Sequence, residues 1–404
     1  MHILEIPSFF PPYGGLFCLN QAKALMALGH EVRILSNVQL GITVGWKDYL
    51  TLPWQRYEHE MAGVTVYQSF QRGIPKVIRP NVDRWVSVVR SMFSEYLAKY
   101  GRPDIIHAHC AKWAGYAAMN LSQEYKIPYV VTEHLPKAIF HVEFGDSTDH
   151  WQIPLLREAY HRAAHVIMVS EELTDDIAYY FGRDYQHVTV SNIVDVDYYA
   201  YRPRPSLDNR SFHFCCPALF VERKGYDVLL EAFNQLYQQN PSVELMIAGQ
   251  GTDSEAFRNL YMRKSCRQQV RCMGVLDKEN IRDMYYHSDA MVLATRGESQ
   301  GLVLLEAMST GIPVVSTEAI PPSVRMQDGA VYVPVDDVDA FRKAMAGVMD
   351  SRYDGQALSS QVASFASPKV IGRKIEAVLR TSLHTVSPPS CSRGVFSQRQ
   401  YFPL

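Results

Sequence analysis

The sequence of 404 residues lacks the signatures of several protein classes. No apolar run approaches the roughly 18 residues that a membrane-spanning helix needs. The seven cysteines form no C-x-x-C pair, which argues against a disulfide framework and a cysteine-rich zinc site. The formal charge of −2 gives no reason to expect nucleic acid as a partner. The N-terminus has no basic region before its apolar residues, so we expect a first β-strand there and a protein of the reducing cytoplasm.

What the sequence does have is a regular alternation of short β-rich runs and helical patterns, typical of parallel sheets built from βαβ units. A chain of this length exceeds the size at which one hydrophobic core stops growing, so we expect two domains. The first would cover residues 1–200 and the second 201–367, joined at a proline-rich segment. A last helix and a polar tail with little order would fill 368–404. The predicted strands are 1–6, 31–35, 64–67, 104–107, 129–132, 166–169 and 188–190, then 212–216, 243–248, 270–273, 290–294 and 313–316. The predicted helices include 111–125 and 253–264, and we expect a long loop over 41–61.

The most informative segment is GESQGLVLLEAM at residues 297–308, which follows a predicted buried strand and leads into a helix. Such a loop lies at the carboxyl edge of an open α/β sheet, where ligands bind, and the first amides of the helix suit a phosphate. Glu298 lies beside that anion site, and Glu306 lies about two turns along the helix. Carboxylates around an anion site indicate a ligand with hydroxyl groups on both sides of a diphosphate, such as a nucleotide sugar. The spacing alone is also compatible with an ordinary helix in which the two glutamates have no common function.

Four other residues lie in turns that follow predicted strands, at the same kind of edge. Gly14 and Gly15 separate the first strand from a helix, where glycines let the backbone approach a ligand; a plain tight turn is the alternative. His134 closes the strand at 129–132, and it is either a ligand-facing histidine or a structural one. Lys224 lies at a strand-to-helix turn that suits a diphosphate; a solvated turn is the alternative.

A metal site receives little support from the sequence. His107 and His109 alternate at the end of a predicted strand, so both side chains lie on one face. No third ligand is evident, and no acidic D-x-D motif stands out, so we interpret the two histidines as hydrogen-bonded strand-end residues and predict no metal. The first strand is also not followed by G-x-G-x-x-G, which argues against a dinucleotide dehydrogenase.

Several of these motifs together resemble those of the retaining glycosyltransferases of family 4. The two glutamates and the residues after them match the E-x7-E signature with its trailing E-A-M-x-x-G-x-P-V-V. Further matches are P-P-x-G-G at 11–15, D-x-x-H-x-H at 104–109, T-x-H at 132–134 and K-G at 224–225. The resemblance covers most of residues 1–380 and is strongest at 221–316. It implies the GT-B fold: two Rossmann-like domains facing across a cleft, with the C-terminal helix crossing back to the N-terminal domain.

The resemblance also implies a role for each matching residue. The catalytic residues would be His134, over the sugar–phosphate bond and donating a hydrogen bond as charge develops, and Glu298, on a hydroxyl of the donor sugar. Glu306 would accept hydrogen bonds from the ribose hydroxyls, and Lys224 would hold the diphosphate with main-chain amides. The full donor-binding set would be Gly14, Gly15, Lys224, Glu298, Gln300, Gly301, Leu302 and Glu306. No metal and no cofactor would take part.

The sequence departs from the family pattern at two places. The position of a phosphate-binding arginine is occupied by Ala218 or Leu219. The nearby Arg223 either takes its place or points to solvent, and we expect the second. The stretch 320–324 replaces a glycine pair and an acid. These departures keep open a nucleotide-sugar-binding protein with little turnover.

The resemblance implies a nucleotide-diphosphate sugar as donor, with a UDP-sugar favoured and GDP-mannose as the alternative. The acceptor would be a glycan or a lipid-linked glycan of surface polysaccharide synthesis; a sugar-phosphate synthase on the same fold is the rival. An aromatic-rich stretch at 41–61 is either an acceptor- or membrane-facing surface or plain packing. In the first case the enzyme would work at the inner face of a membrane.

Overall fold

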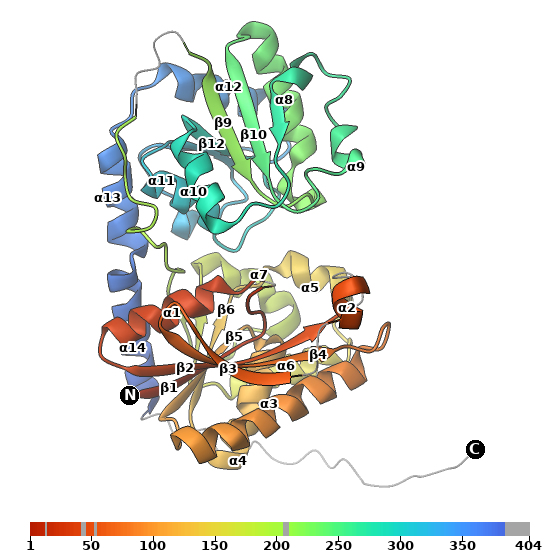
Figure 1. Ribbon diagram of the computed structural model, residues 1–404, viewed down its shortest axis with the longest axis vertical. Helices are drawn as coiled ribbons and strands as arrows, with labels where there is room; N and C mark the ends of the chain where they lie inside the picture. Colours follow the sequence, from red (N-terminus) through yellow and green to blue (C-terminus); the bar gives the residue numbers. More distant parts are fainter. Residues whose placement is uncertain (13, 42–45, 52–54, 205–209, 384–404) are drawn as a thin grey trace, which may run out of the picture.

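The computed structural model of the protein describes residues 1–12, 14–41, 46–51, 55–204 and 210–383. The chain forms two lobes, each built around one sheet, stacked along the long axis of the molecule (Figure 1). The side chain of Trp46 lies outside the described part of the chain. The whole of Trp54 and the polar tail beyond residue 383 lie outside it as well.

The N-terminal lobe holds an eight-stranded sheet in the order β3-β4-β2-β1-β5-β6-β7-β8. All neighbouring strands are parallel except β3 and β4, which pair antiparallel at one edge. The strands are β1 His2–Pro7, β2 Glu31–Leu40, β3 Gln55–Met61, β4 Val64–Arg72, β5 Ile105–His109, β6 Tyr129–Glu133, β7 His165–Met168 and β8 His187–Thr189.

Helices cover both faces of this sheet, because successive residues of each buried strand point to opposite sides. Leu4, Ile106 and Val131 pack into a core with helices on one face, whereas Ile3 and Val130 pack into a second core on the other face. The helices of the first face are α3 Arg79–Tyr100, α4 Tyr116–Tyr125, α5 Lys137–Phe144, α6 Gln152–His161 and α7 Glu171–Phe181; α1 Leu16–Ala27 covers the second face.

The C-terminal lobe holds a six-stranded parallel sheet in the order β11-β10-β9-β12-β13-β14 around one core. Its strands are β9 Phe212–Pro217, β10 Val243–Ala248, β11 Val270–Cys272, β12 Ala290–Leu293, β13 Val314–Thr317 and β14 Ala330–Val333. Its helices are α8 Tyr226–Gln239, α9 Glu255–Arg258, α10 Lys278–Tyr286, α11 Leu302–Ser309, α12 Val338–Asp350 and α13 Gly355–Ala366.

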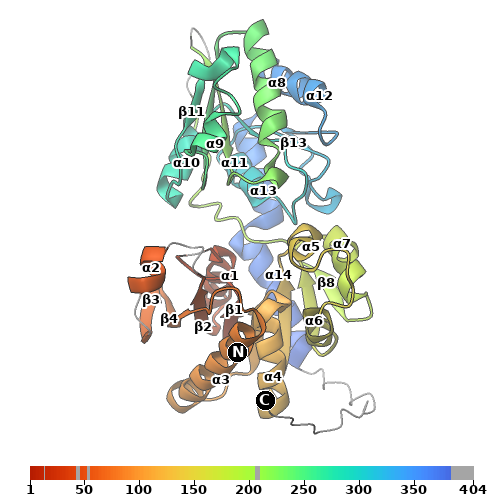
Figure 2. The ribbon, with the colours of Figure 1, turned by 90° about the vertical axis from the view of Figure 1, so that its right-hand side faces the viewer.

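The last helix, α14 Pro368–Leu383, returns to the N-terminal lobe, as the two views show (Figures 1 and 2). Its apolar residues Ile371, Ile375 and Leu379 are fully buried in the core that also contains α1. Gly372 lets the two helices approach closely, since a methyl group there would lie 3.1 Å from the Cβ of Ala24. The predicted GT-B architecture, including the crossover helix, is confirmed.

Some local predictions were wrong. The stretch 41–61, predicted as a loop, contains α2 Trp46–Thr51 and the edge strand β3. The helix predicted at 253–264 is reduced to α9, and the one predicted at 111–125 begins with a π-helical turn at Ala111–Gly115. Among the described helices, none combines the length and the apolar character that crossing a bilayer requires.

Candidate active site

The loop after β9 carries two adjacent cations into the junction of the lobes. Residues Glu222–Lys224 form a short 3-10 turn that ends at Gly225, whose φ is +61°. A side chain at Gly225 would overlap the carbonyl oxygen of Ala294, at the end of β12. The glycine therefore lets this loop pack against the loop that follows β12, and the packing places Lys224 beside Glu298.

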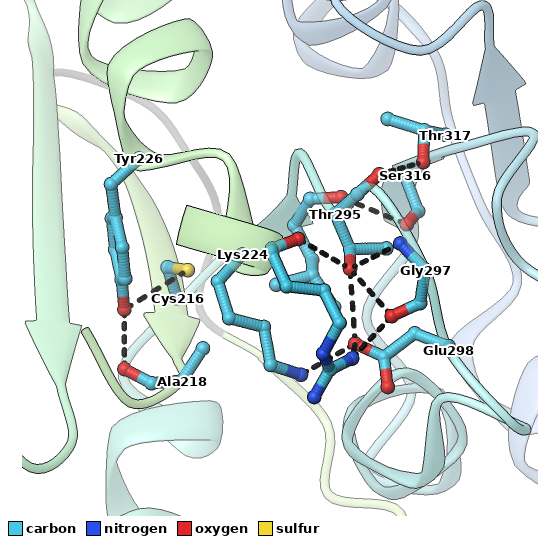
Figure 3. Close-up of polar contacts among 11 residues, drawn as sticks. Cys216, Ala218, Lys224, Tyr226, Thr295, Gly297, Glu298, Ser316 and Thr317 are labelled. Carbon is cyan, nitrogen blue, oxygen red and sulfur yellow. Dashed lines mark hydrogen bonds and ion pairs between the residues drawn. The ribbon is translucent and has the colours of Figure 1, made fainter. Parts of the chain in front are cut away.

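The carboxylate of Glu298 collects several donors, and Figure 3 shows Lys224 and Thr295 directed at it. Its Oε1 lies 2.5 Å from Lys224 Nζ, 3.1 Å from Thr295 Oγ1 and 3.3 Å from Arg223 Nη1. The side chains of Lys224 and Glu298 are only 10% and 11% exposed, so water screens this group weakly. Two cations face one carboxylate, which leaves a net positive charge.

Arg223 does not point to solvent, and that prediction was wrong. Its side chain is 24% exposed, it donates to the carbonyl oxygen of Gly297, and it pairs with Glu298. The position at which the family arginine was expected contributes no cation: Ala218 is buried, and its carbonyl accepts a hydrogen bond from Tyr226. The site therefore has a second cation, supplied by the residue next to Lys224.

The start of α11 lies directly after Glu298. Gly301 precedes the helix with a φ of +82°, and an added Cβ there would lie 2.9 Å from Ile320 Cδ1. The side chain of Gln300 is buried and bound to the other lobe: its Oε1 accepts from the main-chain N–H of Asn192 at 2.9 Å, and its Nε2 donates to Ser191 at 2.5 Å. These two bonds anchor the loop before α11 at the domain junction.

Glu306 lies inside α11 with few polar neighbours. The Tyr285 hydroxyl donates to its Oε2 at 3.3 Å. Burial raises the pKa of Glu306 to about 7, while the Tyr285 hydrogen bond and the charge of Lys278 lower it and Asp195 raises it further. This carboxylate has unused capacity to accept hydrogen bonds from a ligand.

Gly14, Gly15 and His134 belong to the N-terminal lobe, where the glycines precede α1 and His134 directly follows β6. Gly15, with a φ of +82°, lets the loop before α1 pass the main chain of Phe9, where any side chain would overlap. At the start of α1, the ring of Phe17 stacks on His134 with centroids 3.8 Å apart. Burial lowers the pKa of His134 well below its ordinary value, and the nearby His109 and His107 lower it further. His134 is therefore a neutral imidazole.

His107 and His109 both meet a third residue that sequence reasoning missed, Glu5 of β1. Glu5 Oε2 lies 3.0 Å from His107 Nδ1 and 2.7 Å from His109 Nε2, and all three side chains are fully buried. These distances are shorter than the roughly 3.3 Å between ligands of a tetrahedral zinc ion, so the contacts are direct hydrogen bonds. The sequence signal that could have indicated this contact is an acidic residue inside an otherwise apolar first strand.

Glu133, next to His134, has a structural role. Its two oxygens accept hydrogen bonds from the main-chain N–H groups of Ala111, His134 and Leu135 and from the hydroxyl of Tyr160. Burial raises its pKa, and these four hydrogen bonds oppose the rise. The carboxylate holds the loop that carries His134.

A cleft of about 850 Å³ opens between the lobes beside this cluster. Its C-terminal wall consists of residues 296–299, 318, 319, 321 and 322. Its N-terminal wall consists of residues of α5, of Asp146 just after that helix, and of the start of α7. At one side the lobes touch, since Glu172 accepts hydrogen bonds from the N–H and the hydroxyl of Ser323. The cleft therefore has room for a ligand that contacts both lobes.

Comparison with known families and proteins agrees with this arrangement. Residues 14–198 match the family described as Glycosyltransferase Family 4, and residues 211–351 match Glycosyl transferases group 1. A glycogen synthase of Mycobacterium tuberculosis is 28% identical over 87% of this chain and 86% of its own length. A putative colanic acid biosynthesis glycosyltransferase of Salmonella typhimurium, WcaL, is 25% identical over 92% of this chain and 98% of its own.

Solved structures share the fold at low sequence identity. Sucrose-phosphate synthase from Thermosynechococcus elongatus superposes with a TM-score of 0.74 at 18% identity, covering 94% of this chain and 98% of its own. Anabaena HepE in complex with UDP and glucose gives a TM-score of 0.70 at 16% identity, with 94% and 99% covered. The two matched ranges take up most of the chain, one in each lobe, and the chain belongs to the glycosyltransferases of the GT-B fold and family 4 type.

Proposed function

We propose that the protein transfers a sugar from a nucleoside-diphosphate sugar to a glycan or lipid-linked acceptor, with retention of the anomeric configuration and without a metal. The observation that carries the proposal is the cluster at the start of α11. There Arg223 and Lys224 converge on Glu298 beside an interdomain cleft, and Glu306 follows in the helix. Cations, helix amides and hydroxyl-accepting carboxylates are the groups that the parts of a nucleotide sugar require.

The diphosphate would displace Glu298 as the partner of the two cations. Arg223 uses one of its guanidinium nitrogens in the contacts of the cluster, so it retains donors for phosphate oxygens. The amides of Gln300, Gly301 and Leu302 would complete the phosphate site. Glu298 would then accept a hydroxyl of the donor sugar, and Glu306 the ribose hydroxyls.

Retention would follow from attack on the same face that the leaving group occupies. The leaving phosphate takes the proton of the acceptor hydroxyl while the new glycosidic bond forms and the sugar–phosphate bond breaks. Negative charge grows on the phosphate, and Arg223 and Lys224 are placed to stabilise it. With two cations and helix amides available, the reaction does not depend on a metal ion.

The donor base and the acceptor class rest on proteins similar to this one. HepE has been solved with UDP-glucose, and the Escherichia coli trehalose-6-phosphate protein with UDP-2-fluoro glucose, so a UDP-sugar is favoured over GDP-mannose. Relatives named for colanic acid, lipopolysaccharide core and teichuronic acid biosynthesis support a surface-polysaccharide acceptor.

The charge of the cleft favours an uncharged acceptor over a sugar phosphate. On the N-terminal wall, Asp146, Glu172, Asp175 and Asp176 outnumber Lys137. A phosphate on the acceptor would be repelled by these carboxylates. The rival function, a sugar-phosphate synthase, predicts the opposite acceptor preference, and a product assay with neutral and phosphorylated sugars separates the two.

The first experiment is calorimetric titration of the purified protein with UDP, GDP and ADP, with and without magnesium. Binding of one nucleotide, with the same affinity in the presence of magnesium, supports the donor site and identifies its base. Binding of none of them at millimolar concentration overturns the proposal. Donor binding without turnover over a broad acceptor set would instead indicate a nucleotide-sugar-binding protein.

A further inference from the structure

A continuous chain of buried polar side chains runs from β1 to the domain junction. His109 Nε2 lies 2.7 Å from Glu5 Oε2, and His109 Nδ1 lies 3.2 Å from His134 Nε2. Glu5 and His109 are fully buried, and His134 is 8% exposed. The family resemblance implies a role for His134, and neither the resemblance nor the proposed function assigns one to Glu5 or His109.

The direction of each hydrogen bond follows from which of these oxygen and nitrogen atoms carry a proton. Burial alone would raise the pKa of Glu5, but the contacts with His107 and His109 outweigh it and lower the pKa to about 2, so the carboxylate is ionised and can only accept. His109 therefore donates from Nε2. Burial lowers the pKa of His109, so this ring is neutral and its Nδ1 carries a lone pair. His134 must then donate from Nε2 to His109.

One nitrogen of His134 is left, and it carries a lone pair. Among the described residues, His134 Nδ1 has no hydrogen-bond partner although the atom is buried, and the same holds for Asn192 Oδ1. The side chain of Asn192 lies near enough to influence the pKa of His134. A half-turn of the Asn192 amide exchanges its oxygen and nitrogen, so that Nδ2–H would donate to the Nδ1 lone pair. This amide orientation gives the buried Nδ1 of His134 a donor.

We infer that Glu5 and His109 are positioning residues that fix His134 as the Nε2–H tautomer, with its Nδ1 lone pair directed to Asn192 at the domain junction. The chain continues across the lobes, because the main-chain N–H of Asn192 donates to Gln300 Oε1 in the loop before α11. Buried groups of the N-terminal lobe thereby hold the loop that precedes the helix amides.

The consequence for the reaction rests on the proposed function. In this arrangement the one ring proton of His134 is donated to His109, and its one lone pair accepts from Asn192, so no N–H of the ring is available to the reacting region. His134 does not donate to the leaving phosphate, a role that the sequence resemblance implied. Charge on that phosphate is left to Arg223 and Lys224.

Nitrogen NMR of the unmodified protein tests the inference directly. The protein is labelled with ¹⁵N histidine, and the signals of His134, one of 14 histidines, are identified by their loss in His134→Gln. At pH 8 we expect a protonated Nε2 and an unprotonated Nδ1 for His134. A protonated Nδ1, or a ring that exchanges between both tautomers, overturns the inference. This measurement needs no substrate, so its outcome is independent of the proposed function.

Two variants test the positioning role, with His107 as the matched control. Glu5→Gln replaces the acceptor-only carboxylate by an amide, so we expect a mixture of His134 tautomers and a fall in kcat of about tenfold or more, with the donor KM within about twofold. His107→Asn also removes a buried contact of Glu5 but leaves the His109–His134 bond, so the tautomer and kcat should change little. Equal tautomer and kcat values in the two variants would refute the positioning role.

Discussion

The pKa of Glu306 makes nucleotide-sugar binding depend on pH near neutrality. Burial in α11 raises this pKa to about 7, and the proposed ligand contact is with the ionised form, which accepts ribose hydroxyls. Because the folded apo protein has the raised pKa, affinity should be fully present above pH 8 and should fall as the pH drops through 7. The test is therefore to measure nucleotide-sugar affinity over a series of pH values, for the unmodified protein and for Glu306→Gln.

The magnitude follows from the fraction of ionised carboxylate. With a pKa of about 7, about nine tenths of Glu306 is ionised at pH 8 and about one tenth at pH 6. Affinity should fall about tenfold over this interval, which corresponds to about 1.4 kcal/mol. Glu306→Gln cannot titrate, so its affinity should be lower at pH 8 by about 1–3 kcal/mol and flat across the series.

Calorimetry with an intact nucleotide sugar is the suitable assay. A free nucleoside diphosphate ends in a phosphate that itself titrates near pH 6, whereas the diphosphate of the sugar donor does not. Binding at pH 6.5 should release protons, which buffers of different ionisation enthalpy detect. A flat profile for the unmodified protein, or an equally steep one for Glu306→Gln, would refute the assignment of Glu306 as the titrating ligand.

Three further outcomes are expected. Lys224→Met should weaken nucleotide binding by about 1.5–3 kcal/mol, measured by calorimetry, because it removes a buried cation from the phosphate site; unchanged affinity would contradict that site. Gly225→Ala should destabilise the protein by about 2 kcal/mol or more in thermal unfolding, since the new Cβ overlaps Ala294, while the control Gly347→Ala, in open space, should be neutral or stabilising. Leu379→Ala should lower the free energy of unfolding by about 2–5 kcal/mol by leaving a cavity under α14, and Arg380→Ala beside it should have little effect.

Arg223 changes how the departure from the family pattern is understood. Sequence alignment places the phosphate-binding arginine at a position that holds Ala218 or Leu219, which suggested a weakened donor site. In the folded protein, the 3-10 turn before Gly225 turns Arg223 toward Glu298 instead of solvent. A cation can therefore reach the same site from a different position in the chain. Nucleotide titration of Arg223→Met and Lys224→Met would show how much each cation contributes to nucleotide affinity.

Much of the architecture could be predicted from local patterns. Alternating apolar runs and helical periods indicate parallel sheets, and that signal is strong because buried strands and amphipathic helices must each repeat with their own period. The edge strand β3 and helix α2 were missed, since an exposed antiparallel edge strand has neither a continuous apolar run nor a glycine-bounded turn. The helix predicted at 253–264 is reduced to the four residues of α9.

The sequence by itself determined the two-lobed fold class, the position of Glu298 and Glu306 around a helix start, and the place of Lys224 in a strand-to-helix turn. These features depend on neighbours within a few residues. Only the tertiary structure decided that Glu5 meets His109, more than a hundred residues away, because β1 lies beside β5 in the sheet order. It likewise decided that Gln300 reaches Asn192 across the lobes. Strand order and domain docking are set by the packing of whole layers, and no short stretch of sequence carries that information.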